Sequence, residues 1–92
     1  MIVTHPSSQS VDLTQSVTFT CNTTGYNVSY QWTIRSGSFP NKVTSIYSNT
    51  LVIPNVTSSD DNTYTCVASN EGGNVSSNAA QLTVTGKTMM IV

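Results

Sequence analysis

Residues 60–68 read DDNTYTCVA, and this short stretch decides the fold. Tyr64 precedes Cys66 by two positions and Ala68 follows it by two, with Thr65 and Val67 in between. Inward-facing residues at every second position are typical of a β-strand that buries one face. We therefore expect Tyr64, Cys66 and Ala68 to point into a core.

Four other runs along the chain alternate with the same period of two. They comprise Val17, Phe19 and Cys21; Val28, Tyr30, Trp32 and Ile34; Leu51 and Ile53; and Ala80, Leu82 and Val84. Turn-forming pairs such as Thr24-Gly25, Ser36-Gly37 and Gly72-Gly73 separate the runs. Short alternating strands with turns between them predict an all-β sandwich or barrel.

Three weaker segments complete the pattern. Residues 3–5 could form a first edge strand, which Pro6 would end because proline has no N–H to donate to a ladder. Val11 and Leu13 would then resume on the other sheet. Residues 42–48 are expected to form one or two short edge strands.

The length of the chain and its composition predict one small, ordered domain. Ninety-two residues are enough for a single domain. A domain of this size gains from a covalent crosslink, which two cysteines can supply. Charged residues make up only 8% and the net charge is −1, whereas an average domain has about 25% charged residues. Abundant, alternating Val, Ile, Thr and Tyr nevertheless favour order over disorder.

The scarcity of charge and of metal-binding side chains excludes several functions. Nucleic acids and anionic membranes are bound by clustered Lys and Arg, so we expect neither nucleic-acid binding nor direct membrane contact. A zinc site takes about four ligands, and the chain has two Cys and one His. The carboxylates are scattered, at Asp12, Asp60, Asp61 and Glu71. We therefore expect no catalytic residues, no metal, no cofactor and no enzyme activity.

Cys21, Trp32, Tyr64 and Cys66 together resemble the signature of the immunoglobulin superfamily. In that family a disulfide joins strands B and F of two antiparallel Greek-key sheets, a Trp of strand C packs against it, and a tyrosine corner precedes the second Cys. The resemblance covers about residues 3–85. It implies an all-β immunoglobulin-like β-sandwich with a Cys21–Cys66 disulfide. It also implies a core signature of Trp32, Tyr64, Leu51 and Leu82.

Further details resemble the I-set subtype of this family. Leu51-x-Ile53 followed by Val56 looks like its strand E, and Asp60-x-x-x-Tyr64-x-Cys66 looks like the entry to its strand F. On this reading the domain spans residues 1–86. Residues 87–92 are then a C-terminal linker, the start of a next domain or a vector remnant.

Asp60 departs from the pattern of the family. The family often pairs this aspartate with an Arg of strand D, but no basic residue lies between Lys42 and Lys87. The sequence therefore does not predict that ion pair. The stretch Thr57-Ser58-Ser59-Asp60 instead predicts a capping box on a one-turn helix between strands E and F.

Four sequons are candidate sites of N-glycosylation. Asn22, Asn27, Asn55 and Asn74 each begin an N-x-S/T triplet without proline. About two or three such triplets would arise by chance in a chain this rich in Asn, Ser and Thr, yet all four fall at strand ends or in loops. In the family the B–C and F–G loops share one end of the sandwich. We therefore expect Asn22, Asn27 and Asn74 to crowd that tip with sugars and Asn55 to lie at the opposite end.

The outward side of strands C, F and G is expected to present Thr and Gln side chains, and family members often bind partners there. We call this surface the GFC face; its residues are Gln31, Thr33, Thr63, Thr65, Val67, Gln81 and Thr83. The candidate binding face within it is Gln31, Thr33, Thr65, Val67 and Thr83. Its expected occupant is a protein partner, including a second copy of the chain. The alternative is plain solvated sheet, since Val67 is the only large apolar residue in the set.

The resemblance implies a non-catalytic extracellular module for protein recognition or cell adhesion. Such a module would belong to the extracellular part of a cell-surface receptor or adhesion molecule, tethered to the membrane by a single span elsewhere. Two alternatives stay open. One is a structural I-set domain of an intracellular titin-like muscle protein, which the sequons and the low Lys and Glu content disfavour. The other is a ligand-binding ectodomain of a receptor kinase, which differs only in what lies beyond residue 92.

Overall fold

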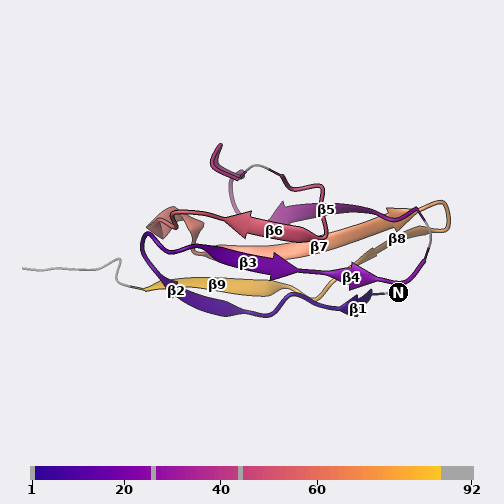
Figure 1. The fold of residues 1–92 in the computed structure, drawn as a ribbon, viewed down its shortest axis with the longest axis horizontal. Helices are drawn as coiled ribbons and strands as arrows, with labels where there is room; N and C mark the ends of the chain where they lie inside the picture. Colours follow the sequence, from indigo (N-terminus) through magenta and orange to yellow (C-terminus); the bar gives the residue numbers. More distant parts are fainter. Residues whose placement is uncertain (1, 26, 44, 86–92) are drawn as a thin grey trace, which may run out of the picture.

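Two facing layers of β-strands make up the chain (Figure 1). The structure is a computed structural model that describes residues 2–25, 27–43 and 45–85. The predicted linker, residues 87–92, lies outside the described residues. The first two strands occur where the sequence predicts them, on either side of Pro6, which is buried.

The smaller layer contains four short strands. They are β1 (Ile2–Thr4), β3 (Val17–Thr20), β4 (Asn22–Thr23) and β6 (Thr50–Ile53). β1 pairs antiparallel with β4, and β3 pairs antiparallel with β6. Only Cys21 separates β3 from β4, so the two pairs form one continuous layer, and the two strands run in line in Figure 1.

The larger layer has the strand order β2-β9-β7-β5, with β8 also paired to β7. These strands are β2 (Gln9–Asp12), β5 (Ser29–Ile34), β7 (Asn62–Asn70), β8 (Gly73–Ser76) and β9 (Ala80–Thr85). β2 runs parallel to β9, and the other pairs are antiparallel. β2 therefore lies on the opposite layer from β1, as predicted for Val11.

Apolar side chains from both layers fill the space between them. The buried cluster consists of Val17, Phe19, Cys21, Trp32, Leu51, Ile53, Val56, Tyr64, Cys66, Ala80, Leu82 and Val84. The period of two is visible in β9, where buried and exposed residues alternate over the whole strand. Leu51 and Leu82, two of the predicted core residues, are completely buried.

The segment between β5 and β6 differs from the prediction. No strand is formed within residues 41–43 and 45–49, although the sequence analysis expected one or two short strands over 42–48. Hydroxyl groups offer this backbone other partners: Ser45 Oγ accepts from the Tyr47 N–H at 3.3 Å, and Ser48 Oγ accepts from the Thr50 N–H at 3.3 Å. Local bonds of this kind compete with a strand ladder.

Residues 5–8 carry the chain from the smaller layer to the larger one. They form hydrogen bonds with the segment that includes strand G of the sequence analysis. In the structure this segment is divided into β8 and β9 by residues 77–79. His5 Nδ1 accepts a hydrogen bond from the Asn78 N–H at 2.9 Å, and Ser8 Oγ accepts one from the Gln81 N–H at 3.0 Å. Side chains of residues 5–8 thus bond to backbone N–H groups within the break and at the start of β9.

Candidate functional site

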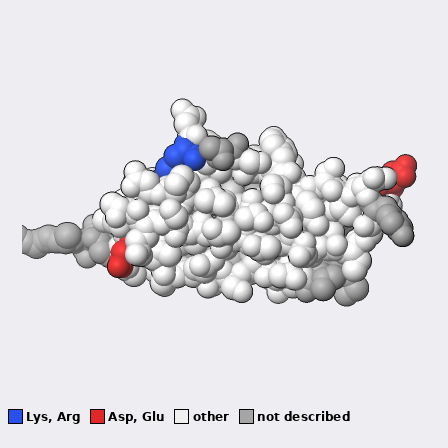
Figure 2. Space-filling view, in the orientation of Figure 1, with Lys and Arg blue, Asp and Glu red and all other residues white. Residues whose placement is uncertain are grey.

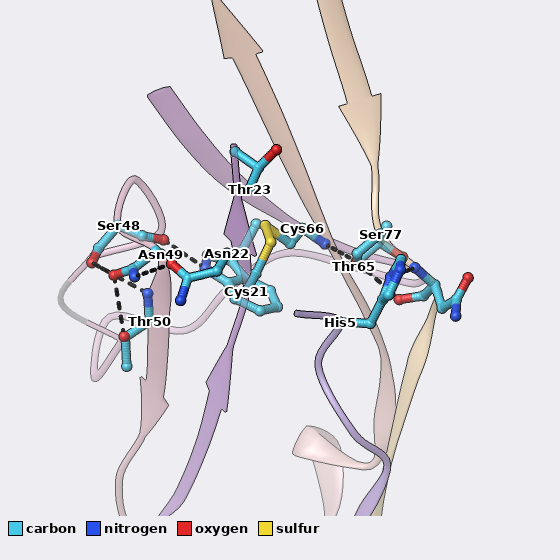
Figure 3. The surroundings of a disulfide bond; sticks show 12 residues. His5, Cys21, Asn22, Thr23, Ser48, Asn49, Thr50, Thr65, Cys66 and Ser77 are labelled. Carbon is cyan, nitrogen blue, oxygen red and sulfur yellow. Dashed lines mark hydrogen bonds between the residues drawn. A yellow bond between two sulfur atoms is a disulfide. The ribbon is translucent and has the colours of Figure 1, made fainter. Parts of the chain in front are cut away.

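A disulfide between Cys21 and Cys66 joins the two layers (Figure 3). Both residues are completely buried, and their Cα atoms are 6.4 Å apart. The predicted pairing is confirmed. Beside the bond, Ser77 Oγ accepts from the Cys66 N–H at 3.0 Å and donates to the Asn78 carbonyl at 2.9 Å. The Ser77 N–H also donates to the Cys66 carbonyl at 2.8 Å, so both backbone groups of Cys66 are hydrogen-bonded where the crosslink joins β7.

Trp32 lies directly opposite Cys66 in the ladder between β5 and β7. Its side chain is 1% exposed, and its ring centroid is 6.3 Å from that of Phe19. The indole N–H donates to the Ser48 carbonyl at 2.8 Å. A buried Trp with a satisfied N–H is the arrangement that the sequence predicted beside the disulfide.

Tyr64 forms the predicted tyrosine corner. Its hydroxyl donates to the Asp60 carbonyl at 2.7 Å, and its ring centroid is 5.5 Å from that of Phe19. Burial raises the pKa of the Tyr64 hydroxyl to about 12, with smaller contributions from the negative charges of Asp60 and Asp61. The hydroxyl is therefore a neutral donor at physiological pH, and its role is structural.

Asp60 ends a one-turn 3₁₀ helix, η1 (Ser58–Asp60), and closes the predicted capping box. Its carboxylate accepts from the Thr57 N–H at 2.8 Å. The sequence analysis did not predict an ion pair for Asp60, and this was wrong: Lys42 Nζ lies 2.5 Å from Asp60 Oδ2. Lys42 also donates to the Asn55 carbonyl at 2.9 Å. Lys42 belongs to the irregular segment between β5 and β6, and the alternating pattern of the strands does not predict where a side chain of such a segment lies.

The GFC face is an uncharged surface of hydroxyl and amide groups along the middle of β5, β7 and β9. Gln31 lies opposite Val67, and Thr33 lies opposite Thr65. Gln31, Thr33, Gln81 and Thr83 are exposed, and Thr63, Thr65 and Val67 are partly exposed. Several of these groups bond across the strands, including Thr63 Oγ1 to Gln81 Oε1 at 2.9 Å and Thr33 Oγ1 to the Thr65 carbonyl at 3.4 Å. The structure therefore brings together Gln31, Thr33, Thr65 and Val67, whereas Thr83 lies on the same side but beyond the row of Thr63 and Gln81.

Charged atoms are sparse over the surface as a whole. In the view of Figure 2, red atoms lie near the two ends and blue atoms on the upper left part, and the broad surface to the right of the blue atoms is uncharged up to the far end. Lys and Arg together number three, and Asp and Glu together number four. Lys42 forms an ion pair with the buried Asp60, so these two charges neutralise each other. Long-range electrostatic steering of a partner is therefore weak for this domain.

All four sequon asparagines are exposed. Asn22 lies in β4, and its side-chain carbonyl accepts from the Asn49 amide at 3.2 Å. Asn27 lies just before β5, and Asn55 follows β6 at the other end of the sandwich. Asn74 lies inside β8, not in the turn before it. The sequence analysis placed Asn74 at the tip; it is the second residue of β8, beside the hairpin turn, and the pairing of β8 with β7 also makes it part of the larger sheet.

A pocket of about 240 Å³ opens between the layers at the end that carries the β7–β8 hairpin. Its lining includes the apolar side chains of Val28, Ala68 and Val75, and it is bordered by Gly72, Gly73 and Asn74. Val75 is 38% exposed although it lies opposite the buried Ala68. The two layers thus separate beyond the disulfide, and sequence reasoning gave no signal for this opening.

Neither a metal centre nor a membrane span is found in the described part of the chain. Within residues 2–25, 27–43 and 45–85, no three His, Cys, Asp or Glu side chains are grouped so that they could hold an ion. The same residues contain no helix with the length and apolar character needed to cross a bilayer.

The sandwich, its disulfide, its buried Trp and its tyrosine corner match a known family. A family model described as "Immunoglobulin domain" matches residues 1–70. The chain is an immunoglobulin domain. The predicted family and fold class are therefore confirmed, and the I-set subtype stays a prediction.

Relatives of this immunoglobulin domain include large cell-surface proteins. MAM domain-containing glycosylphosphatidylinositol anchor protein 2 is 35% identical over 72 residues in Mus musculus, and 36% identical over 72 residues in Homo sapiens. Each match covers 76% of this chain but only 8% or 7% of the relative. The chain thus spans a small fraction of the length of these curated relatives.

Solved structures with the same fold include parts of several proteins with repeated immunoglobulin domains. Tandem Ig repeats of Dlar match with a TM-score of 0.79 at 25% identity, covering 91% of this chain and 46% of that one. Extracellular domains 3–5 of Drosophila OTK match with a TM-score of 0.74 at 27% identity, covering 91% and 29%. The domain therefore resembles the extracellular modules of cell-surface proteins.

Proposed function

We propose that this immunoglobulin domain is a non-catalytic extracellular recognition module of a cell-surface protein, and that it binds a protein partner through the GFC face. The observation that carries this proposal is the candidate binding face itself. Gln31, Thr33, Thr65 and Val67 form one continuous, uncharged surface on the sheet, and Thr83 lies on the same side beyond the row of Thr63 and Gln81. A protein partner can be matched there by hydrogen bonds and by apolar contact with Val67.

The similarity to other proteins supports an extracellular location. OTK contributes domains that are described as extracellular, and the curated relatives are described as glycosylphosphatidylinositol anchor proteins. The domain is accordingly proposed to be tethered to a membrane by another part of its protein, through either a span or a lipid anchor. These similarities favour this role over the intracellular, titin-like alternative.

The chemistry of the face sets the character of the contact. Because the face lacks ion pairs, binding should change little with salt concentration. With one partly exposed Val and no aromatic residue, a single contact should be weak. Repeated domains on one surface compensate through avidity, since the second contact is made at high effective concentration.

A bead assay tests the proposal in multivalent form. Beads coated with the glycosylated domain are mixed with one another and with cells, and aggregation and adhesion are scored. Thr33→Arg and Thr65→Arg should abolish both by placing a long charged side chain in the contact. Thr18→Arg changes an exposed Thr of β3 on the smaller layer and should bind normally. Binding that survives both substitutions on the GFC face would contradict the proposal.

A further inference from the structure

Asn74 faces the same side of the sheet as Val67. β8 pairs antiparallel with β7 so that Ser69 lies opposite Asn74, Ala68 opposite Val75, and Val67 opposite Ser76. Residues that oppose each other in a ladder point to the same face, and successive residues alternate. Because Ala68 is buried in the sandwich, Val75 faces inward and Asn74 faces outward.

The register across β5 places Asn74 at the edge of the candidate binding face. Ser29 lies opposite Ser69, and Gln31 lies opposite Val67. The row Ser29–Ser69–Asn74 is therefore the neighbour of the row Gln31–Val67–Ser76. Two residues along a strand span only about 7 Å. A substituent on the Asn74 amide that is larger than one side chain can reach Val67.

Asn74 differs in this respect from the other three sequon asparagines. Asn22 belongs to β4 of the smaller layer and shares a hydrogen bond with Asn49. Asn27 lies outside the strands, and Asn55 lies at the far end of the sandwich. Among the described residues the Asn74 side chain makes no hydrogen bond, and it is exposed. Its amide is thus accessible, and it is the one sequon amide carried by a strand of the larger sheet.

We propose that Asn74 carries an N-linked glycan, and that this glycan covers the half of the candidate binding face around Gln31 and Val67. The half around Thr33 and Thr65, with Thr83 beyond it, stays open to a protein partner. Whether Asn74 is glycosylated then determines how much of the candidate binding face a protein partner can contact. This inference rests on the proposed function and adds a form of control to the same surface.

The modification is an ordinary group transfer. Asn74 Nδ2 bonds to C1 of the first N-acetylglucosamine of a lipid-diphosphate-linked oligosaccharide. The bond from C1 to the diphosphate oxygen breaks, the lipid diphosphate leaves with the electron pair, and the amide loses one proton. No oxidant or reductant takes part.

The neighbouring pocket provides a competing position for the sugar. Asn74 borders the pocket whose apolar lining is formed by Val28, Ala68 and Val75. A glycan that turned inward would fill this opening and leave Gln31 and Val67 free. The two positions differ in which side chains touch the first sugar, so they can be told apart without any binding partner.

Nuclear magnetic resonance of the glycosylated, isotope-labelled domain tests the inference. Glycans are trimmed to the first N-acetylglucosamine, and nuclear Overhauser effects from its protons are assigned. Contacts to the Val67 methyl groups and amide shifts at Gln31 and Ser69 are expected. Asn74→Gln and Ser76→Ala should both remove them, because each destroys the sequon. Ser76→Thr keeps the sequon and should keep the contacts, and Asn55→Gln should leave them unchanged.

Two results would overturn the inference. One is an unoccupied Asn74 in peptide mass spectrometry of the protein from the glycosylating host. The other is a set of sugar contacts confined to Val28, Ala68 and Val75. Neither result bears on the bead assay, in which loss of binding by Thr33→Arg and Thr65→Arg is read separately. Failure of that assay would remove the proposed function but leave the position of the sugar as measured.

Discussion

The indole N–H of Trp32 donates to the backbone carbonyl of Ser48, 2.8 Å away and sixteen residues later in the chain. The backbone N–H of Trp32 donates to the Ile46 carbonyl at 2.7 Å, and the Cys21 N–H donates to the Asn49 carbonyl at 2.8 Å. Residues 46–49 are thus attached to β5 of one layer and to Cys21 of the other. The disulfide, the Trp and this irregular segment stabilise each other at one level of the sandwich.

Replacing Trp32 should loosen this segment as well as the core. Trp32→Ala should lower the free energy of unfolding by about 3–5 kcal/mol, because it leaves a cavity beside the disulfide. Trp32→Phe keeps a ring but leaves the Ser48 carbonyl without its donor, and should cost about 1–3 kcal/mol. Denaturant unfolding followed by circular dichroism measures both, and amide exchange at Cys21 should speed up in the Phe variant. Unchanged exchange at Cys21 would show that the segment does not depend on the indole.

Reducing the disulfide should weaken the domain without changing its fold class. The native chain should have a mass two hydrogens below that of the reduced chain. Opening the loop between Cys21 and Cys66 should lower stability by about 2–5 kcal/mol, since the chain-entropy model assigns about 4 kcal/mol to a loop of this length. Unfolding curves with and without reductant measure the difference. Alkylation of both thiols in native, unreduced protein would refute the prediction.

The ion pair between Lys42 and Asp60 should contribute more than a surface pair. The Asp60 side chain is only 3% exposed and that of Lys42 is 24% exposed, so Lys42→Met leaves a buried carboxylate without its counter-charge. We expect a cost of about 1–3 kcal/mol. In a double-mutant cycle, Lys42→Met with Asp60→Asn should cost less than the sum of the two single changes.

Arg35 provides the matched control for this cycle. It is an exposed cation of the same domain, and Arg35→Gln should change stability by less than about 0.5 kcal/mol. Equal effects of Lys42→Met and Arg35→Gln, measured by denaturant unfolding, would mean that the ion pair contributes nothing beyond its surface charge.

The raised pKa of Tyr64 predicts how stability falls in alkali. Folding raises the pKa of this hydroxyl from 10.0 to about 12, so the folded state holds the proton more tightly than the unfolded state. The stabilisation is complete below pH 10 and is lost as the pH rises from 10 to about 12. Each unit corresponds to about 1.4 kcal/mol, so the total loss is about 2–3 kcal/mol.

Tyr64→Phe separates this effect from other alkaline changes. The variant loses the hydrogen bond to the Asp60 carbonyl, which should cost about 1 kcal/mol at neutral pH. Its stability should then depend less on pH between 10 and 12 than that of the native domain, although the other tyrosines are retained. Parallel curves for the two proteins over this range would contradict the assignment to Tyr64.

The strands with strict alternation could be predicted from the sequence, and the irregular connections could not. Phe19, Trp32, Tyr64 and Leu82 occupy inward positions in runs of period two, so their burial followed from the pattern. Gly72-Gly73 was predicted as a turn-forming pair, yet β8 begins at Gly73 because its backbone pairs with that of Asn70. Turn propensity and long-range pairing competed at this position, and the pairing prevailed.

Contacts between residues far apart in the sequence also could not be predicted. Lys42 and Asp60 are eighteen residues apart, and His5 and Asn78 seventy-three residues apart. Neither pair lies at a spacing that local patterns can reveal, since their approach depends on how the layers pack. The candidate binding face was predictable as a set of outward residues, because alternation alone assigns side chains to a face. That Asn74 shares this side required the register of β8.

The parallel pairing of β2 with β9 has a mechanical consequence. The start of β1 and the end of β9 lie at opposite ends of the sandwich (Figure 1). Tension between these two points pulls β2 toward its amino end and β9 toward its carboxyl end, so the parallel strands slide past each other in shear. The hydrogen bonds along the four residue pairs from Gln9–Leu82 to Asp12–Thr85 then carry the load together instead of opening one by one. A pull along the long axis is therefore resisted by this short ladder as well as by the pairing of β1 with β4 next to the amino end.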